Sequence, residues 1–400
     1  MYKAYCRAYQ RTLKFLSPIL TWREPELIEG ANSVEKLPEV IKSIGINKIL
    51  IVTDSDIRSL GLINGLLEAL KTSQIEFFIY DKTVPNPTIE NIEEALELYQ
   101  NSECQGIIAF GGGSPMDCAK GVGARVARPE KSITQMKGQF KIRKEIPPLF
   151  AVPTTSGTGS EATIAAVITD SQSHEKYAII DLNLMPHYAV LDPLLTIKLP
   201  ATITAATGLD ALTHAVEAYI GKSNTIETRK YSIEAVRLIY GNLYEAYSNG
   251  SNLAARENMQ KAAFLAGAAF TRAYVGNVHA IAHTLGGFYL VPHGLANAII
   301  LPHVLEHYEK TVHKPLAELA DAAGIAEGSE TIDQKAVKFI NSIKTLNSKM
   351  DIPTKVSGIK DSDIPIMADH ALKEANPLYP VPKIFNKDDM LKIYGLIKEA

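Results

Sequence analysis

The hydrophobic pattern changes its period once along the chain, near residue 192, and this change restricts the possible folds. Before it, short apolar runs rich in β-branched residues alternate with amphipathic stretches. Six of these runs predict strands: 48–54, 75–81, 106–110, 148–152, 178–181 and 188–192. A helical pattern over residues 88–99 separates the second strand from the third. Continuous apolar strands alternating with helices are typical of a mostly parallel sheet covered on both faces, as in nucleotide-binding α/β domains.

After residue 202 the period is helical almost throughout. Six long patterns predict helices: 203–220, 225–248, 252–271, 277–287, 294–310 and 331–349. The segment 376–382 contains three prolines, so we expect an ordered extended segment there instead of a helix. A chain of 400 residues is long enough for two domains. The sequence therefore predicts an α/β domain over residues 1–197 and an all-helical domain over residues 198–400.

Charge and cysteine content exclude several classes of protein. The formal net charge is −3, so the chain lacks the basic excess that binding to nucleic acid phosphates requires. The three cysteines, Cys6, Cys104 and Cys118, show no paired spacing, so the sequence predicts neither a disulfide framework nor a thiolate metal site. These features favour a reducing, cytoplasmic environment.

The first residues form a basic amphipathic pattern, with Lys3, Arg7, Arg11 and Lys14 at helical spacing. Such a pattern is compatible with a transit peptide, with a helix at a membrane surface, or with a helix packed on the protein body or on a second subunit. The adjacent apolar run is short and lacks a cleavage-like end, which favours the packed helix. No apolar stretch reaches the ~18–20 residues of a membrane span. We therefore expect no stable membrane association.

A glycine-rich turn follows the third predicted strand. Residues 111–113 are all glycine, Ser114 stands at the expected N-cap, Pro115 at the first helical position, and Asp117 three residues after the cap. A helix that begins this way presents backbone N–H groups and the positive end of its dipole to an anion, and so suits a pyrophosphate. A plain connection between strand and helix is the alternative, because a single glycine turn is a weak signal.

Two further segments favour a dinucleotide. Asp54 ends a predicted strand, where a carboxylate can accept both ribose hydroxyls and would repel a 2′-phosphate, so NAD is favoured over NADP. A helix cap is the alternative role of Asp54. Residues 153–161, PTTSGTGSE, follow another strand, and their hydroxyl and N–H groups can line the phosphates and the nicotinamide.

The histidines of the helical half are grouped. Asp210 and His214 lie four residues apart in one helical pattern, His279 and His283 lie four apart in another, and His293 follows ten residues later. Residues four apart share a helix face. One carboxylate and three imidazoles suit Fe²⁺ or Zn²⁺, although a single histidine is more often a core residue. Glu217, near one turn beyond His214, fits either a contact to a ligand or a helix salt bridge, and the sequence favours neither.

Five motifs together resemble the iron-containing (group III) alcohol dehydrogenase family. They are GGGSPMDCAK at 111–120, PTTSGTGSE at 153–161, LDP at 191–193, GLDALTHAVEAY at 208–219 and HAIAHTLGGFYLVPHGLANAIILPH at 279–303. The resemblance runs from about residue 29 to the C-terminus. It implies a dehydroquinate synthase-like fold, with an N-terminal α/β nucleotide-binding domain, a C-terminal all-helical metal-binding domain, and the active site in the cleft between them.

The resemblance also assigns roles to individual residues. It implies metal ligands at Asp210, His214, His279 and His293, and it places His283 near the nicotinamide as a catalytic proton relay that is not a ligand. The implied cofactor-binding residues are Asp54, Gly112, Gly113, Ser114, Asp117, Thr154, Thr155, Thr158 and Lys176.

We therefore expect an NAD-dependent oxidoreductase with Fe²⁺ (or Zn²⁺) that interconverts small primary alcohols and aldehydes, and that forms a homodimer or larger homo-oligomer. Residues 162–166, ATIAA, stand where diol-specific family members tend to carry a polar amide, which favours simple alcohols. A diol or glycerol dehydrogenase and a hydroxyacid–oxoacid transhydrogenase remain alternatives on the same scaffold. A non-catalytic metal- or nucleotide-binding protein is a more distant one.

Overall fold

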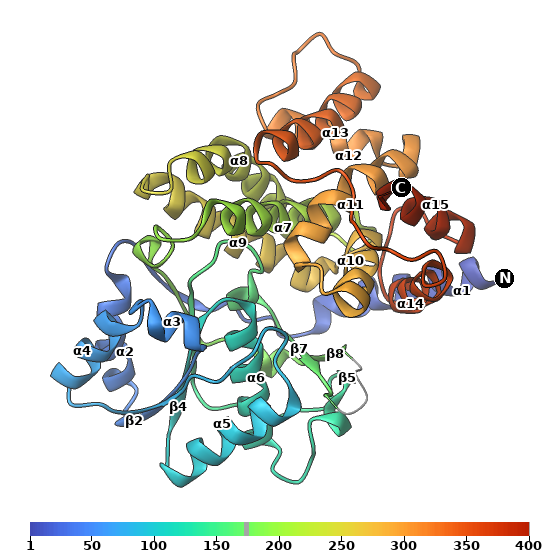
Figure 1. Ribbon diagram of the computed structural model, residues 1–400. Helices are drawn as coiled ribbons and strands as arrows, with labels where there is room; N and C mark the ends of the chain where they lie inside the picture. The colour runs from blue at the N-terminus through green and yellow to red at the C-terminus, as the bar shows by residue number, and fades with distance from the viewer. Residues whose placement is uncertain (172–175, 400) are drawn as a thin grey trace. The chain divides into compact units, whose positions relative to one another are not determined.

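The computed structural model describes residues 1–171 and 176–399, which form two compact units, Thr21–Lys198 and Met1–Leu20 with Leu199–Ala400 (Figure 1). The predicted fold class, an α/β half followed by an all-helical half, is confirmed. We expected the first 20 residues to belong to the α/β domain, and this was wrong. They belong to the helical unit, because Arg7 donates to the carbonyl oxygens of Val381 (2.7 Å) and Pro382 (2.8 Å).

The α/β unit is built on a six-stranded parallel sheet in the order β1-β9-β6-β4-β2-β3. Its strands are β1 (Glu26–Glu29), β2 (Lys48–Val52), β3 (Glu76–Tyr80), β4 (Gly106–Gly111), β6 (Leu149–Pro153) and β9 (Tyr188–Leu191). A smaller sheet contains β5 (Gly138–Gln139), β8 (Lys176–Ile180) and β7 (Ala165–Thr169). The sequence did not predict β1, which mixes apolar with polar residues, or β5, which has two residues; it also missed β7, although that strand is almost entirely apolar.

Helices cover both faces of the large sheet, as the continuous apolar strands predicted. The helices of this unit are α2 (Leu37–Ser43), α3 (Ser55–Ser59), α4 (Asn64–Thr72), α5 (Ile89–Asn101) and α6 (Gly113–Ala127). Alternate residues of one strand enter different cores: Ile51 packs with residues of α2 and α4, and Leu50 with residues of α5 and α6. In Figure 1, α2 and α4 lie on one side of the sheet and α5 and α6 on the other.

Three loops meet at the carboxyl edge of this sheet. Strands β2, β4 and β6 are neighbours, and Val52 pairs with Ala109 while Gly111 pairs with Pro153. The residues that follow these strands include Asp54, the glycine turn and Thr154. In open parallel sheets ligands bind outside the carboxyl ends of the strands. The topology thus places the three segments that we expected to bind NAD at one edge.

The helical unit packs around α7, whose residues 208–220 are all buried. Its helices are α1 (Tyr2–Leu16), α7 (Ala201–Ile220), α8 (Ile226–Ser248), α9 (Leu253–Ala273), α10 (Asn277–Tyr289), α11 (His293–Tyr308), α12 (His313–Ala322), α13 (Ile332–Lys349), α14 (Ile364–Ala375) and α15 (Lys387–Ile397). Helices α8, α9 and α11 pack directly on α7. Residues 376–382 are not helical, as predicted, but they begin with a turn. Within the described residues, no helix has the length and apolarity of a membrane span.

Candidate metal centre and cofactor loops

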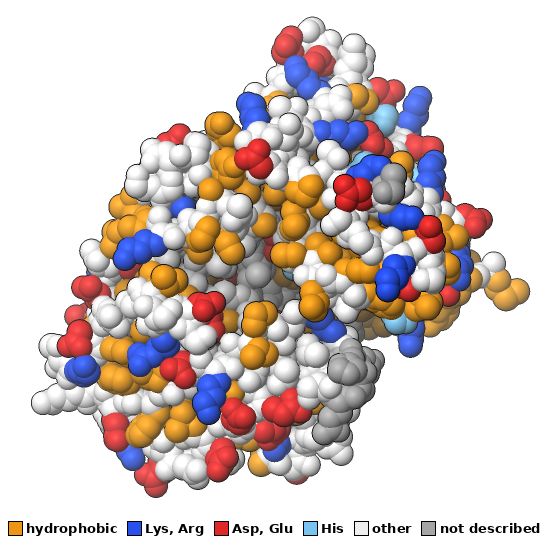
Figure 2. Space-filling view, in the orientation of Figure 1, with side chains coloured by type: hydrophobic (Ala, Val, Ile, Leu, Met, Phe, Trp, Pro, Cys, Tyr) orange, Lys and Arg blue, Asp and Glu red, His pale blue; other side chains and the backbone are white. Residues whose placement is uncertain are grey.

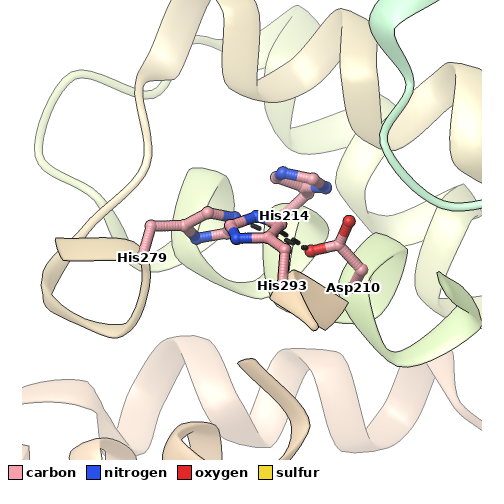
Figure 3. Close-up of side chains that lie close together, drawn as sticks. All are labelled: Asp210, His214, His279 and His293. Atoms are coloured by element: carbon pink, nitrogen blue, oxygen red, sulfur yellow. Dashed lines mark ion pairs between the residues drawn. The ribbon is translucent and has the colours of Figure 1, made fainter. Parts of the chain in front are cut away.

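Four side chains from three helices converge inside the helical unit (Figure 3). Helix α7 supplies Asp210 and His214 from successive turns, α10 supplies His279, and α11 begins with His293. One ligand-type atom from each residue lies within 4.8 Å of the others. The Asp210 Oδ1 atom is 3.5 Å from His293 Nε2 and 3.9 Å from His279 Nε2. The structure therefore brings together the same four residues that we expected to bind the metal.

The buried carboxylate of Glu217 fixes the orientation of His279. Its Oε2 accepts the N–H of Gly276 (2.8 Å) and faces His279 Nδ1 at 2.7 Å, and its Oε1 accepts the N–H of Val278 (2.8 Å). Glu217 on α7 thus caps the first turn of α10 and occupies Nδ1, which leaves Nε2 of His279 directed at the cluster. Gly276 is required here, since a Cβ atom would lie 2.6 Å from Glu217 Oε1.

Burial sets the protonation of this pair. It lowers the pKa of His279 well below its usual value, and the neighbouring histidines lower it further, so the ring is neutral. Neutral imidazole is the form that binds a metal. Burial also raises the pKa of Glu217 to about 7, while the backbone N–H groups that it accepts oppose this change. The sequence left the role of Glu217 open, and the structure shows a direct contact to His279.

Asn297 is a second residue that the sequence analysis missed. Its Nδ2 lies 2.7 Å from Asp210 Oδ1 and 3.2 Å from both His279 Nε2 and His293 Nε2, and the side chain is buried. One amide nitrogen has two hydrogens and cannot satisfy three acceptors. The Asp210 oxygen and the Nε2 atoms of the neutral histidines therefore have lone pairs directed at one point, and such a set of donor atoms suits a borderline divalent cation, such as Fe²⁺ or Zn²⁺. The available signal was the position of Asn297, one turn after His293.

His283 lies beside the cluster but makes different contacts. Its ring stacks on that of His293, with centroids 5.1 Å apart, and its Nδ1 is 2.6 Å from Glu374 Oε1. The same Glu374 oxygen accepts the hydroxyl of Tyr379 at 2.8 Å. The sequence pattern did not identify Glu374 or Tyr379. The geometry separates His283 from the four converging side chains and gives it a carboxylate partner of its own.

The glycine turn after β4 opens helix α6 without a side-chain cap. We expected Ser114 at the N-cap and Asp117 three residues after it, as in a capping box, and the structure contradicts both assignments. The N-cap is Gly112; Ser114 Oγ accepts the N–H of Asn86 (3.2 Å), and the Asp117 carboxylate accepts from Ser160 Oγ and the N–H of Val167, both at 3.1 Å. Because no side chain caps the first turn, its N–H groups suit an anion.

The second predicted cofactor segment packs against this turn. A Cβ atom on Gly112 would lie 3.6 Å from the side chain of Thr155, and one on Gly113 would lie 3.1 Å from Thr158 Cγ2. Thr154 is buried, and its N–H donates to the carbonyl oxygen of Gly111 (3.0 Å). The glycine turn and residues 153–161 therefore form one continuous surface, and at the glycines the backbone of this surface is not covered by side chains.

Buried Lys120 holds the far end of that segment and was not recognised in the sequence. Its ammonium nitrogen lies within 3.0 Å of five oxygens of Ser160, Thr163 and Ala165, which share its three hydrogens. Burial lowers the pKa of Lys120 to about 8 and raises those of Asp117 to about 6 and Glu161 to about 7, and Lys120 opposes the shifts of both acids. A cation three residues after Asp117, on an otherwise apolar helix face, was the missed signal.

The two remaining cofactor candidates have partners within the α/β unit. Asp54 caps α3, and its Oδ1 accepts the N–H of Ile57 at 2.8 Å, which is the alternative role that the sequence left open. Exposed Lys176 donates to Asn86 Oδ1 at 2.6 Å. Since the N–H of Asn86 donates to Ser114, Asn86 joins Lys176 to the first turn of α6. The binding of ribose by Asp54 and of the cofactor by Lys176 stay predictions.

Known proteins resemble this chain over nearly its whole length. The family model of iron-containing alcohol dehydrogenase matches residues 25–193, and that of the Fe-containing alcohol dehydrogenase family C-terminal region matches residues 204–397. The chain is 40% identical over 370 residues to 1,3-propanediol dehydrogenase of Klebsiella pneumoniae, covering 91% of this chain and 95% of that protein. It is 34% identical over 352 residues to NAD-dependent methanol dehydrogenase of Bacillus methanolicus, covering 88% and 92%.

A solved structure agrees with these relationships. The crystal structure of a 1,3-propanediol oxidoreductase superposes with a TM-score of 0.90 at 38% identity, covering 94% of this chain and 98% of that one. Identity of this order over nine-tenths of both chains, together with the clustered aspartate and histidines, leaves one assignment. The chain belongs to the iron-containing alcohol dehydrogenase family and is an oxidoreductase.

Proposed function

We propose that the protein interconverts small primary alcohols and aldehydes, using NAD(H) and one divalent metal ion. The convergence of Asp210, His214, His279 and His293 carries this proposal. A divalent ion held by these residues supplies a Lewis acid for the substrate oxygen, and NAD supplies the hydride acceptor. Fe²⁺ and Zn²⁺ both suit the four side chains, and the family name favours iron.

The chain's own residues hold and prepare the site. Glu217 keeps the Nε2 lone pair of His279 directed at the cluster, and the Asn297 amide orients the Asp210 carboxylate. Residues that orient ligands in this way raise metal affinity and fix geometry. His283, held through Nδ1 by Glu374, keeps its other nitrogen to accept the proton that leaves the alcohol.

NAD is proposed to bind at the carboxyl edge of the large sheet. The uncapped first turn of α6 would accept the pyrophosphate, and Thr155 and Thr158 lie beside the glycines of that turn. Asp54, which follows the neighbouring strand β2, would bind the ribose hydroxyls and repel a 2′-phosphate. The NAD-dependent relative from Bacillus methanolicus supports this choice of cofactor.

A diol is the second candidate substrate, because the Klebsiella pneumoniae relative is a 1,3-propanediol dehydrogenase. We had disfavoured diols on the apolar sequence of residues 162–166. In the structure Ala162, Thr163, Ile164 and Ala166 are buried, and Thr163 Oγ1 holds Lys120. Packing in the α/β unit accounts for their character, so this argument no longer separates simple alcohols from diols.

The deciding experiment starts from protein stripped with a chelator and reloaded with Fe²⁺ under anaerobic conditions, or with Zn²⁺. Oxidation of NADH is followed with propanal and with 3-hydroxypropanal, and NADPH is tested in parallel. Metal-dependent turnover of NADH with propanal supports the proposal, and turnover with 3-hydroxypropanal alone assigns a diol dehydrogenase. Turnover only with NADPH removes the argument from Asp54. Exchange between a hydroxyacid and an oxoacid without added cofactor indicates a transhydrogenase, and dinucleotide binding without turnover indicates a non-catalytic protein.

We also propose that the enzyme works in the cytoplasm as a homodimer or larger homo-oligomer. The three cysteines are buried free thiols, which supports a reducing compartment. Size-exclusion chromatography with light scattering tests the oligomeric state, and a monomer at micromolar concentration would refute it.

A further inference from the structure

Exposed large hydrophobic side chains are concentrated in the N-terminal segment, which comprises α1 and the few residues that flank it. Of the exposed large hydrophobic residues in the described chain, six fall within the first 19 residues: Met1, Tyr2, Tyr5, Phe15, Leu16 and Ile19. Phe15 is 77% exposed and Ile19 71%. Soluble proteins seldom expose apolar side chains in such a group, and groups of this kind mark interaction sites. In Figure 2, hydrophobic side chains project at the N-terminal end of α1.

The helix itself is firmly held by its other side. Cys6 is buried against Val381 and Ile384, and Gln10 donates to the carbonyl oxygens of Pro377 (3.2 Å) and Tyr379 (2.7 Å). The exposed apolar side chains therefore sit on an anchored helix that lies along the surface of the unit. Tyr2, Tyr5 and Tyr9 form a ladder along it, with successive ring centroids 6.4 Å apart. Tyrosine is typical of surfaces that are apolar on one side and wet on the other.

The same helix is strongly basic. The first 23 residues carry five positive side chains and no negative one, although the whole chain has a formal net charge of −3. A cavity of about 280 Å³ on its flank is lined by Arg7, Gln10, Arg11, Lys14, Lys222 and Ser223. No acidic side chain is among these lining residues. Burial lowers the pKa of Lys222, and Arg7 and Arg11 lower it further by like-charge repulsion.

We propose that this face, the outer side of α1 with its basic cavity, docks on an anionic phospholipid membrane. An amphipathic helix with aromatic side chains and flanking cations is the structure that binds in the plane of a membrane surface. The phosphate groups of the lipids would neutralise Arg11, Lys14 and Lys222, whose charges no acidic residue of the cavity balances. Symmetric pairing of this face with the same face of a second copy would bring these like charges together, so charge complementarity favours the membrane. This proposal revises our expectation of no stable membrane association, and it is independent of the reaction that the enzyme catalyses.

Flotation of the full-length protein with lipid vesicles tests the proposal. We expect binding to vesicles of phosphatidylcholine with phosphatidylglycerol, release when the ionic strength rises from about 0.1 M to about 1 M, and no binding to phosphatidylcholine alone. The charge variant Lys3→Glu/Arg11→Glu should bind these vesicles at least about 30-fold more weakly than the wild type, because each surface cation contributes about 1 kcal/mol to binding. Its control is Lys42→Glu/Lys314→Glu, which reverses two exposed cations elsewhere.

A second pair of variants tests the apolar part. Tyr5→Ser/Leu16→Ser removes two side chains that are 57% and 46% exposed, and we expect at least a tenfold loss of vesicle binding. The control Ile226→Ser/Ile332→Ser changes residues that are 79% and 53% exposed, at the first positions of α8 and α13, and should bind like the wild type. Unchanged thermal unfolding in all four variants would show that folding is intact.

The following results would overturn the proposal. One is equal binding to neutral and anionic vesicles. Another is vesicle binding as strong as that of the wild type in both test variants. The third is binding of inorganic phosphate at the basic cavity without any vesicle binding, which would assign the cavity to a small anion. If instead Tyr5→Ser/Leu16→Ser dissociates an oligomer and the wild type binds no vesicles, the face belongs to a second copy of the chain.

Discussion

The substitution Glu217→Gln tests how a residue that contacts a proposed metal ligand, but is not a ligand itself, supports the metal site. The carboxylate faces three groups that donate or can donate: the N–H groups of Gly276 and Val278 and the Nδ1 of His279. Glutamine offers one oxygen and one amide NH₂ in the same space. If its oxygen faces Gly276 and His279, the NH₂ opposes the N–H of Val278.

The opposite orientation of the amide is equally unfavourable. The NH₂ would then face the N–H of Gly276 and would require His279 Nδ1 to accept a hydrogen bond. That tautomer carries its proton on Nε2, the atom that points toward Asp210, and a protonated nitrogen cannot bind a metal. One buried donor left without an acceptor costs about 1–3 kcal/mol of stability. Loss of such a supporting residue typically lowers metal affinity 10- to 100-fold, which corresponds to about 1.4–2.8 kcal/mol.

Metal affinity is measured by competition with a chromophoric chelator for Zn²⁺, and stability by thermal unfolding with and without metal. The control is Glu318→Gln, because Glu318 accepts from Tyr219 (2.6 Å) and Arg229 (2.7 Å) and contacts no histidine of the cluster. We expect weaker metal binding only in Glu217→Gln. Affinity within about threefold of the wild type, or an equal loss in the control, would refute the reasoning.

Four other predictions follow from the two units. His279→Ala should lose metal and activity together, whereas His283→Ala should retain metal by elemental analysis and lose turnover; an empty site in the second variant would contradict our separation of ligand from relay. Lys120→Met removes a buried cation whose three hydrogens are shared among five oxygens, and it should lower the free energy of unfolding by about 3 kcal/mol or more in denaturant titrations, with no change in metal content. Burial, and to a smaller extent repulsion from an arginine, lowers the pKa of His187 to about 4. As the pH decreases from about 6.5 to about 4 the unfolded chain binds the proton first, so the free energy of unfolding should fall by at most about 3 kcal/mol. The variant His187→Asn keeps an acceptor for the N–H of Leu149 and should lack this decrease in urea titrations at each pH. Asp54→Asn retains a good helix cap but loses the charge, so protein stability should stay the same. The ratio of kcat/KM for NADP to kcat/KM for NAD should rise, because the repulsion of the 2′-phosphate is removed. An unchanged ratio would show that Asp54 only caps the helix.

The sequence by itself determined the features that depend on local periodicity. The strands β2, β3, β4, β6, β8 and β9 and the helices α5, α7 to α11 and α13 all lie where the hydrophobic pattern predicted them. The proposed metal residues were also found locally, because Asp210 with His214 is one turn of a helix and His279 opens a similar pattern. Only His293 then had to be added from elsewhere in the chain.

The residues that support the site were decided by the tertiary structure. Glu217 meets His279 across 62 residues, Asn297 meets Asp210 across 87, and Glu374 meets His283 across 91. Such contacts leave no periodic trace, because each needs one polar side chain opposite one partner after two helices have packed.

The start of α6 and the place of α1 show the same limit. Ser114 and Asp117 fit a local cap, but Asp117 instead meets Val167, on β7 of the small sheet, and Ser160, in the turn before that strand. Helix α1 is first in the chain, yet it packs on residues near the end, since Arg7 and Gln10 find carbonyl oxygens there that no helix or strand uses. A local pattern specifies which face of a segment is apolar, whereas the position of its partners is known only once the chain has folded.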